Sequence, residues 1–137
     1  MDDLQKAKTL LETEGYTCVL CRGDHFHTSR CRGVQPLMAL LDDDVSGFSA
    51  ADKVVGKATA LLYCLLKVKA VYACVISDAA AEVLTHNGIT VQWKTKVPFI
   101  VNRDGTGRCP MELATEHISD PSEAPDAITK KLKELQG

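Results

Sequence analysis

A chain of 137 residues, 45% of them hydrophobic, with a formal net charge of -2, is long enough to bury the core of one compact domain. Charges of both signs are interspersed, which gives no electrostatic basis for nucleic acid or an anionic membrane as a partner. The acidic opening and the short apolar runs match neither a secretory signal nor a membrane span. We therefore expect one domain over residues 1–137, located in the cytoplasm, with its six cysteines as thiols.

The N-terminal part of the chain predicts a helix followed by a β-hairpin. Apolar residues recur at helical spacing over residues 2–14, and Gly15 is placed to end that helix. Two β-rich runs within residues 16–29 flank Gly23 and Asp24, which are typical turn residues of a hairpin.

A long helix is predicted after the short helix that Pro36 opens. Ser49 has the chemistry of an N-cap, and Asp52 follows three residues later, as in a capping box. The apolar residues after Asp52 recur at helical spacing. We therefore expect residues 49–68 to form one helix.

The second half of the chain predicts a buried strand–helix–strand unit with a parallel, right-handed crossover. Only the three residues KTK separate this unit from a further β-rich run, and so short a connection requires an antiparallel last pair of strands. The expected elements are strands at 70–77, 89–93 and 97–102, helices at 79–86 and 109–117, and a C-terminal helical extension over 119–137.

The stretch CVLCRGDHFHTSRC raises the question of a zinc or redox site. Cys18 and Cys21 are three residues apart, so on an extended strand their side chains point to opposite faces. Val19 and Leu20 between them are poor turn residues, whereas a zinc knuckle needs a tight turn there. We therefore expect no metal, and we interpret these thiols as core residues.

A second stretch, ADKVVGKAT, is a near-match to the phosphate-binding P-loop. Ala51 stands where the first glycine belongs, and Ala58 stands where the magnesium-binding hydroxyl belongs. The expected helix over 49–68 would also place Gly56 and Lys57 inside a helix rather than after a strand. Nucleotide binding through a P-loop is therefore not expected.

Two helix starts and one glycine-rich loop carry the candidate site. Helix starts offer unpaired backbone N–H groups to anions, and glycines let a phosphate approach the backbone. Cys109 directly before Pro110 is a candidate nucleophile, with Glu112 one turn later as its base, while Arg103 and Arg108 add positive charge. The catalytic candidates are Cys109, Asp52 and Glu112, and the predicted ligand-binding residues are Ser49, Asp52, Lys53, Ser77, Asp78, Asn102, Gly105, Thr106, Gly107, Arg108 and Cys109.

The stretches YTCVLCRGD, GFSAADKVVGKATALLY, GITVQW and NRDGTGRCPMELA resemble a small family of uncharacterised prokaryotic proteins with a cytidine-deaminase-like fold. The resemblance covers about residues 4–118 and implies a three-layer α/β/α domain with a mixed sheet. It also implies a cleft at the helix starts, where deaminases hold zinc and the base. Deaminases carry His-x-Glu and Pro-Cys-x-x-Cys at two helix starts, whereas this chain has AADK and SDAAA.

The sequence thus leaves three functional alternatives. The first is a metal-free domain, without a cofactor, that binds a nucleotide-like or other phosphate-bearing ligand in the former deaminase cleft. The second is a transferase or hydrolase that uses Cys109 or Asp52 as a covalent nucleophile, and the third is a non-enzymatic interaction protein. We also expect a homodimer, because the helix VVGKATALLYCLL is too apolar to face solvent.

Overall fold

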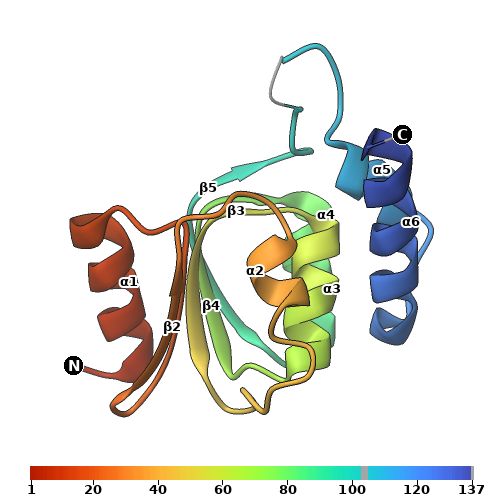
Figure 1. The fold of residues 1–137 in the computed structure, drawn as a ribbon. Helices are drawn as coiled ribbons and strands as arrows, with labels where there is room; N and C mark the ends of the chain where they lie inside the picture. The colour runs from red at the N-terminus through yellow and green to blue at the C-terminus, as the bar shows by residue number, and fades with distance from the viewer. Residues whose placement is uncertain (103–104, 137) are drawn as a thin grey trace.

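Five strands form one open sheet with the order β2-β1-β3-β4-β5 (Figure 1). The computed structural model describes residues 1–102 and 105–136. The strands are β1 (Cys18–Arg22), β2 (His25–Ser29), β3 (Ser49–Val55), β4 (Ala70–Ser77) and β5 (Thr90–Val97). The helices are α1 (Asp3–Glu14), α2 (Gln35–Met38), α3 (Lys57–Leu66), α4 (Asp78–His86), α5 (Pro110–Thr115) and α6 (Ala124–Gln136), with a 3-10 turn η1 (Pro121–Glu123) before α6.

The helices are distributed unequally over the two faces of the sheet. α1 alone packs on one face, where Val19, Cys21, Ala51 and Tyr72 meet it, while α2, α3 and α4 cover the other (Figure 1). α5 and α6 pack on the outer side of α3, so they add a layer beyond the predicted α/β/α arrangement. The structure is therefore a mixed α/β domain with an open five-stranded sheet.

The N-terminal helix and hairpin are confirmed. Asp2 caps α1 by accepting from the Gln5 N–H at 2.8 Å, and Gly15 ends the helix in a left-handed conformation. β1 and β2 pair antiparallel around the predicted Gly23–Asp24 turn. Cys18 and Cys21 lie in the two different core clusters, on opposite faces of the sheet, as their spacing predicts.

The predicted helix over 49–68 is wrong in its first part. Residues 49–55 form β3, which pairs antiparallel with β1 and parallel with β4, so tertiary pairing on both sides overrides the local capping pattern. The helix itself, α3, begins at Lys57 after Gly56. Ser49 is consequently no N-cap, and Gly56–Lys57 does follow a strand, contrary to the expectation used against the P-loop.

The predicted antiparallel last pair of strands is also wrong. The residues KTK do not form a turn but continue β5, which stays parallel to β4 as far as Val97 opposite Ser77. Within the described part of residues 98–109, strand pairing is limited to an isolated antiparallel bridge between Val101 and Arg108. In the described sheet the antiparallel pairs are β1–β2 and β1–β3.

The apolar character of α3 is explained within one chain. Most of its side chains are buried, and Leu61, Leu62 and Tyr63 fully so, because α3 lies between the sheet on one side and α5 and α6 on the other. This burial removes the reason for expecting a homodimer through α3. In α6, Ile128 is buried, whereas Leu135 is exposed.

Each described helix is too short or too polar to span a membrane.

Candidate functional site

The three parallel strands end side by side, and the site lies at that edge of the sheet. Val55 of β3 is opposite Ile76 of β4, and Ser77 is opposite Val97 of β5. α3 and α4 begin directly after β3 and β4, so both helix starts meet at this edge. Ligands of open α/β sheets commonly bind at the carboxyl ends of the parallel strands.

An open groove of about 1050 Å³ runs between α4 and β5, from this edge, at Asp78 and Lys96, to the C-terminal end of α4 at Asn87. Its strand wall carries Val91, Trp93 and Lys96, and its helix wall includes Asp78. The Lys96 ammonium lies 5.2 Å from the centre of the Trp93 ring and 4.0 Å from the Asp78 carboxylate. The remaining lining residues are Lys57, Ala81, Glu82, Val83, Thr85, His86, Asn87, Ile118 and Ser119.

Trp93 is the residue that makes this groove suitable for a planar ligand. It is the single tryptophan of the chain, and 41% of its surface is exposed although its strand is part of the sheet. An exposed indole offers a flat face for stacking, and a nearby ammonium adds an anion-binding group. The groove therefore combines an aromatic surface with positive charge from Lys57 and Lys96.

Glu112 of α5 accepts a hydrogen bond from the N-terminal end of α3. One carboxylate oxygen accepts the Lys57 N–H at 3.3 Å, and the other accepts the Ile100 N–H at 2.9 Å. Glu112 is 4% exposed, so its negative charge occupies the positive end of α3 within the protein itself. This geometry fits a residue that fixes the 98–101 segment to α3, rather than a base facing a ligand.

Asp52 lies in the interior of β3, on the face that α3 covers. Its carboxylate accepts the Tyr63 hydroxyl at 2.7 Å and the Val54 N–H at 3.4 Å. The Tyr63 oxygen is also 3.4 Å from the Cys18 sulfur. Burial raises the pKa of Asp52 to about 7, although the hydrogen bond from Tyr63 favours the charged form. Burial likewise raises the pKa of Tyr63 and of the Cys18 thiol.

The structure does not bring Asp52 together with Glu112. Asp52 precedes Gly56, which Glu112 touches, by four residues of an extended strand, or about 13 Å. Cys109 is near Glu112 through Ile100, whose carbonyl accepts the Cys109 N–H at 2.8 Å. Cys109, Asp52 and Glu112 line neither the large groove nor a smaller cavity between α1 and β5.

The glycine-rich loop uses its own backbone donors internally. The Asn102 side chain accepts the Thr106 N–H at 3.0 Å, and the Asn102 carbonyl accepts the Gly105 N–H at 3.1 Å. These two donors are therefore not free for a phosphate. Arg108 donates to the Glu116 carboxylate at 2.9 Å. Arg103, which was expected to add charge, lies outside the described residues.

The other predicted binding residues are dispersed. Ser49 and Lys53 lie on β3, with Ser49 at its amino end, away from the carboxyl edge. Ser77 caps α4 by accepting the Ala80 N–H at 3.2 Å. Asp78 is the predicted binding residue that lines the large groove.

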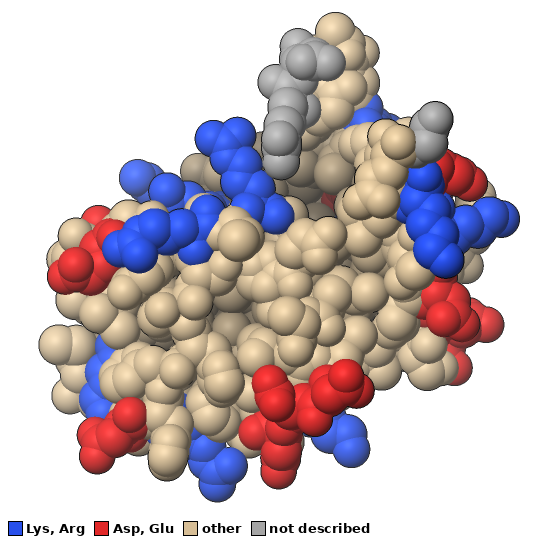
Figure 2. Space-filling model, in the orientation of Figure 1, with Lys and Arg blue, Asp and Glu red and all other residues tan. Residues whose placement is uncertain are grey.

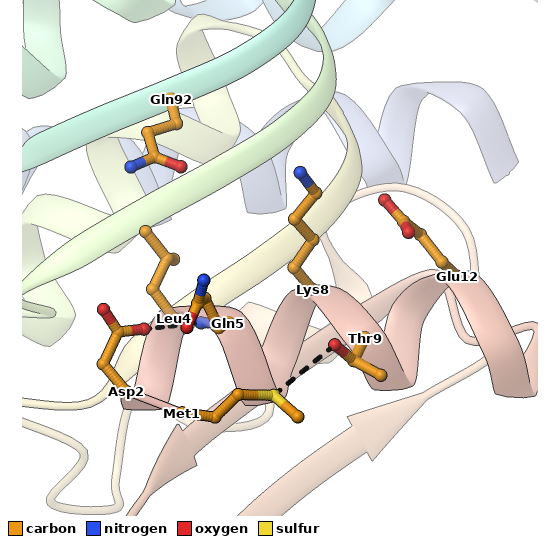
Figure 3. Close-up of a pocket in the computed structure, with 8 residues that line it drawn as sticks. All are labelled: Met1, Asp2, Leu4, Gln5, Lys8, Thr9, Glu12 and Gln92. Carbon is orange, nitrogen blue, oxygen red and sulfur yellow. Dashed lines mark hydrogen bonds between the residues drawn. The ribbon is translucent and has the colours of Figure 1, made fainter.

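A smaller cavity of about 360 Å³ lies on the opposite face of the sheet, between α1 and β5 (Figure 3). Leu4, Lys8 and Glu12 rise from α1 toward the strands, and Gln92 faces them from β5 (Figure 3). The Lys8 ammonium already lies 4.6 Å from the centre of the Tyr72 ring. The predicted site residues do not line this cavity.

Sequence reasoning missed Trp93, Lys96 and Lys57 as groove residues. The available signal was a tryptophan at the end of the predicted strand with a lysine three residues later, but using it required knowing that the strand continues through KTK and is an edge strand. Lys57 was expected inside a helix, because the end of β3 was not recognised.

A protein-family model matches almost the whole chain. The profile described as "TM1506: Domain of unknown function (DUF1893)" matches residues 6–132. The chain belongs to the DUF1893 family. A solved structure of a DUF1893 family protein (TM1506) from Thermotoga maritima is similar to it, with a TM-score of 0.86 and 27% sequence identity. That match covers 94% of this chain and 89% of the other, and no curated protein matches.

This DUF1893 protein is expected to purify without stoichiometric zinc. Within the described residues there is no group of three or more His, Cys, Asp or Glu side chains arranged to hold a metal ion. Elemental analysis after dialysis measures the metal content directly. About one zinc per chain would contradict the prediction.

Proposed function

We propose that this DUF1893 protein is a metal-free binding domain of the cytoplasm, with a deaminase-like arrangement, that holds a nucleotide-like, phosphate-bearing ligand in the groove between α4 and β5. The observation that carries the proposal is the exposed Trp93 ring with the Lys96 ammonium 5.2 Å from its centre, in the wall of that groove. The base would stack on Trp93, and the phosphate would replace the Asp78 carboxylate as the ion-pair partner of Lys96.

The groove carries charges of both signs, Lys57 and Lys96 against Asp78 and Glu82, which suits a ligand with both anionic and hydrogen-bonding groups. Lys96 can bind phosphate oxygens, and Lys57 has further donors for them although its ammonium already donates to the Glu116 carbonyl at 2.8 Å. Asp78 can accept hydrogen bonds from hydroxyl or amino groups. Figure 2 shows Lys and Arg side chains along part of the upper side of the molecule, Asp and Glu side chains at its left and right ends, and side chains of both signs at its lower edge.

The covalent alternative has no comparable support. Asp52 is buried beneath Tyr63, and Glu112 is already bonded to two backbone N–H groups. Cys109 is half-buried at the start of the short helix α5. A nucleophile must be within reach of its base and of a bound substrate, and this geometry supplies no space shared by the three residues.

The binding proposal predicts a fluorescence response from Trp93, the single tryptophan. Titration with adenosine and guanosine mono- and triphosphates should change its emission in a saturable way, because a stacked base quenches the indole. Lys96→Ala should weaken this binding about tenfold, which corresponds to about 1.4 kcal/mol. Lys57→Ala should act in the same direction.

Lys94→Ala is the matched control, because Lys94 belongs to the same strand but does not line the groove. It should leave the affinity unchanged. Inorganic phosphate and unphosphorylated nucleosides test the two halves of the ligand separately. An emission that no nucleotide alters, together with an unchanged melting temperature, would show that the groove is not a nucleotide site.

A further inference from the structure

The two edges of the sheet differ in a way that concerns self-association. Edge strands expose free backbone groups, and soluble proteins protect them with charged residues, proline or covering segments. β5 carries Lys94 and Lys96, two such protective charges. β2, whose sequence is HFHTS, has no lysine, acidic residue or proline, and 43% of Phe26 is exposed.

The hairpin geometry determines which backbone groups of β2 face outward. Arg22 and His25 flank the two-residue turn, in which Gly23 has a φ of 61°, and therefore form the closing hydrogen-bonded pair. Backbone bonding alternates along an antiparallel strand, so His25 and His27 bond to β1. Phe26 and Thr28 then direct their N–H and C=O groups away from the sheet.

We propose that the outer edge of β2 pairs antiparallel with β2 of a second copy of this chain, with the two-fold axis at His27. In this register Phe26 lies opposite Thr28 of the partner subunit, so the outward groups of both residues are satisfied. Aromatic and β-branched side chains opposite each other are a favourable cross-strand pair. The two sheets would join into one continuous sheet.

Charge complementarity supports this register. With the axis at His27, Asp24 in the hairpin turn lies opposite Arg30 of the partner subunit, and the pair occurs twice in the dimer. Arg30 is held in place beside the end of β2, since it donates to the Glu14 carbonyl at 3.0 Å and stacks 4.3 Å from the centre of the Tyr16 ring. On β5 the two lysines would face each other in a self-pairing centred on Thr95, which is unfavourable.

The size of the contact determines how it should be observed. Stable complexes bury about 1,200–2,000 Å² in total, and two strands of five residues supply less than that. We therefore expect a dimer that dissociates on dilution. The groove lies beside β5, the edge strand at the other side of the sheet from β2. We therefore expect nucleotide binding and dimerisation to be independent.

Sedimentation velocity of the full chain over a dilution series tests the proposal. The unmodified chain should shift from dimer to monomer as it is diluted through the micromolar range. Thr28→Pro removes an outward N–H and should give a monomer at every concentration, with an unchanged circular dichroism spectrum. Thr28→Val keeps the backbone donor and should still dimerise.

Asp24→Lys provides an independent variant in the exposed turn, should the proline variant fail to fold. It places a lysine opposite Arg30 of the partner subunit and should raise the dimer dissociation constant about tenfold or more. A chain that is monomeric at high micromolar concentration overturns the proposal. So does a dimer that persists in a folded Thr28→Pro variant, because its interface must then lie elsewhere.

Discussion

Asp52→Asn is expected to flatten the pH dependence of the free energy of unfolding between about pH 4 and pH 7. Burial raises the pKa of Asp52 from its ordinary value of 3.8 to about 7 in the folded chain. Between these values the folded state holds a proton that the unfolded state has released. The folded state therefore loses stability as the pH rises through this range, and the loss is complete above about pH 7.

The magnitude follows from the size of the shift. Each pKa unit corresponds to about 1.4 kcal/mol, so ionised Asp52 can cost the fold up to about 4 kcal/mol at pH 8 relative to pH 4. Among the described residues, no ion pair within 4.0 Å compensates this carboxylate. The asparagine variant should consequently be the more stable protein at pH 8 and close to the unmodified chain at pH 5.

The hydrogen-bond chain at Asp52 can serve both protonation states. With Asp52 ionised, Tyr63 donates to it, and the Cys18 thiol can donate to the Tyr63 oxygen. With a proton on Asp52, or an amide at residue 52, the direction can reverse so that Tyr63 donates to the sulfur. The substitution therefore leaves the chain satisfied and isolates the charge.

Urea unfolding at a series of pH values, followed by circular dichroism, measures this effect. The comparison is the difference between the two proteins at each pH, because every other titratable group is common to both. Tyr63→Phe should destabilise the chain most at pH 8, where Asp52 loses its donor. Parallel curves for the unmodified chain and Asp52→Asn would mean that Asp52 is not buried as a neutral acid.

The elements that sequence reasoning predicted correctly are those whose signals are local. The end of α1 at Gly15, the Gly23–Asp24 turn and the buried strand β4 each depend on residues a few positions apart. The opposite faces of Cys18 and Cys21 followed from strand periodicity alone. These signals do not depend on what the segment packs against.

β3 could not be predicted because its local and tertiary signals conflict. Ser49 and Asp52 match a capping box, but β1 and β4 pair with the segment from both sides. An aspartate in the interior of a central strand is unusual and stays there because Tyr63 donates to it. The predicted helix began at Ser49, eight residues before the observed start of α3 at Lys57. The candidate residue at the helix start was therefore named as Asp52 instead of Lys57.

The candidate site was predicted only in its general location. The carboxyl ends of the parallel strands were expected to hold the ligand, and one end of the groove, at Asp78 and Lys96, lies there, whereas Trp93 is in the middle of its strand, opposite Ala73. Its side chains come from α4, an edge strand and the segment near Ser119. Which of these face one space depends on long-range packing that no spacing in the sequence encodes.

Gly56→Ala is expected to destabilise the chain, in contrast to the usual effect of this substitution. Gly56 has φ and ψ of -93° and -178°, which alanine adopts readily, so the loss of unfolded-state entropy alone would stabilise by about 0.4–1 kcal/mol. A β-carbon at this position would lie 3.1 Å from both Cγ and Oε1 of Glu112 and 3.3 Å from the Ile100 side chain.

Glu112 cannot move aside without a further cost. Its two oxygens accept the N–H groups of Lys57 and Ile100, and displacement would leave buried donors unpaired at about 1–3 kcal/mol each. We therefore expect Gly56→Ala to lower the free energy of unfolding by about 1–3 kcal/mol. Glu112→Ala should cost at least as much, because it removes both acceptors.

Gly107→Ala is the matched control for this prediction, since a β-carbon there would meet nothing within 4 Å. It should leave the stability unchanged or slightly raised, as measured in the same urea titrations. The double variant Gly56→Ala with Glu112→Ala should cost less than the sum of the two single changes, because the alanine at position 112 removes the group that position 56 contacts. Strictly additive losses would show that the Gly56 backbone and the Glu112 carboxylate do not share this contact.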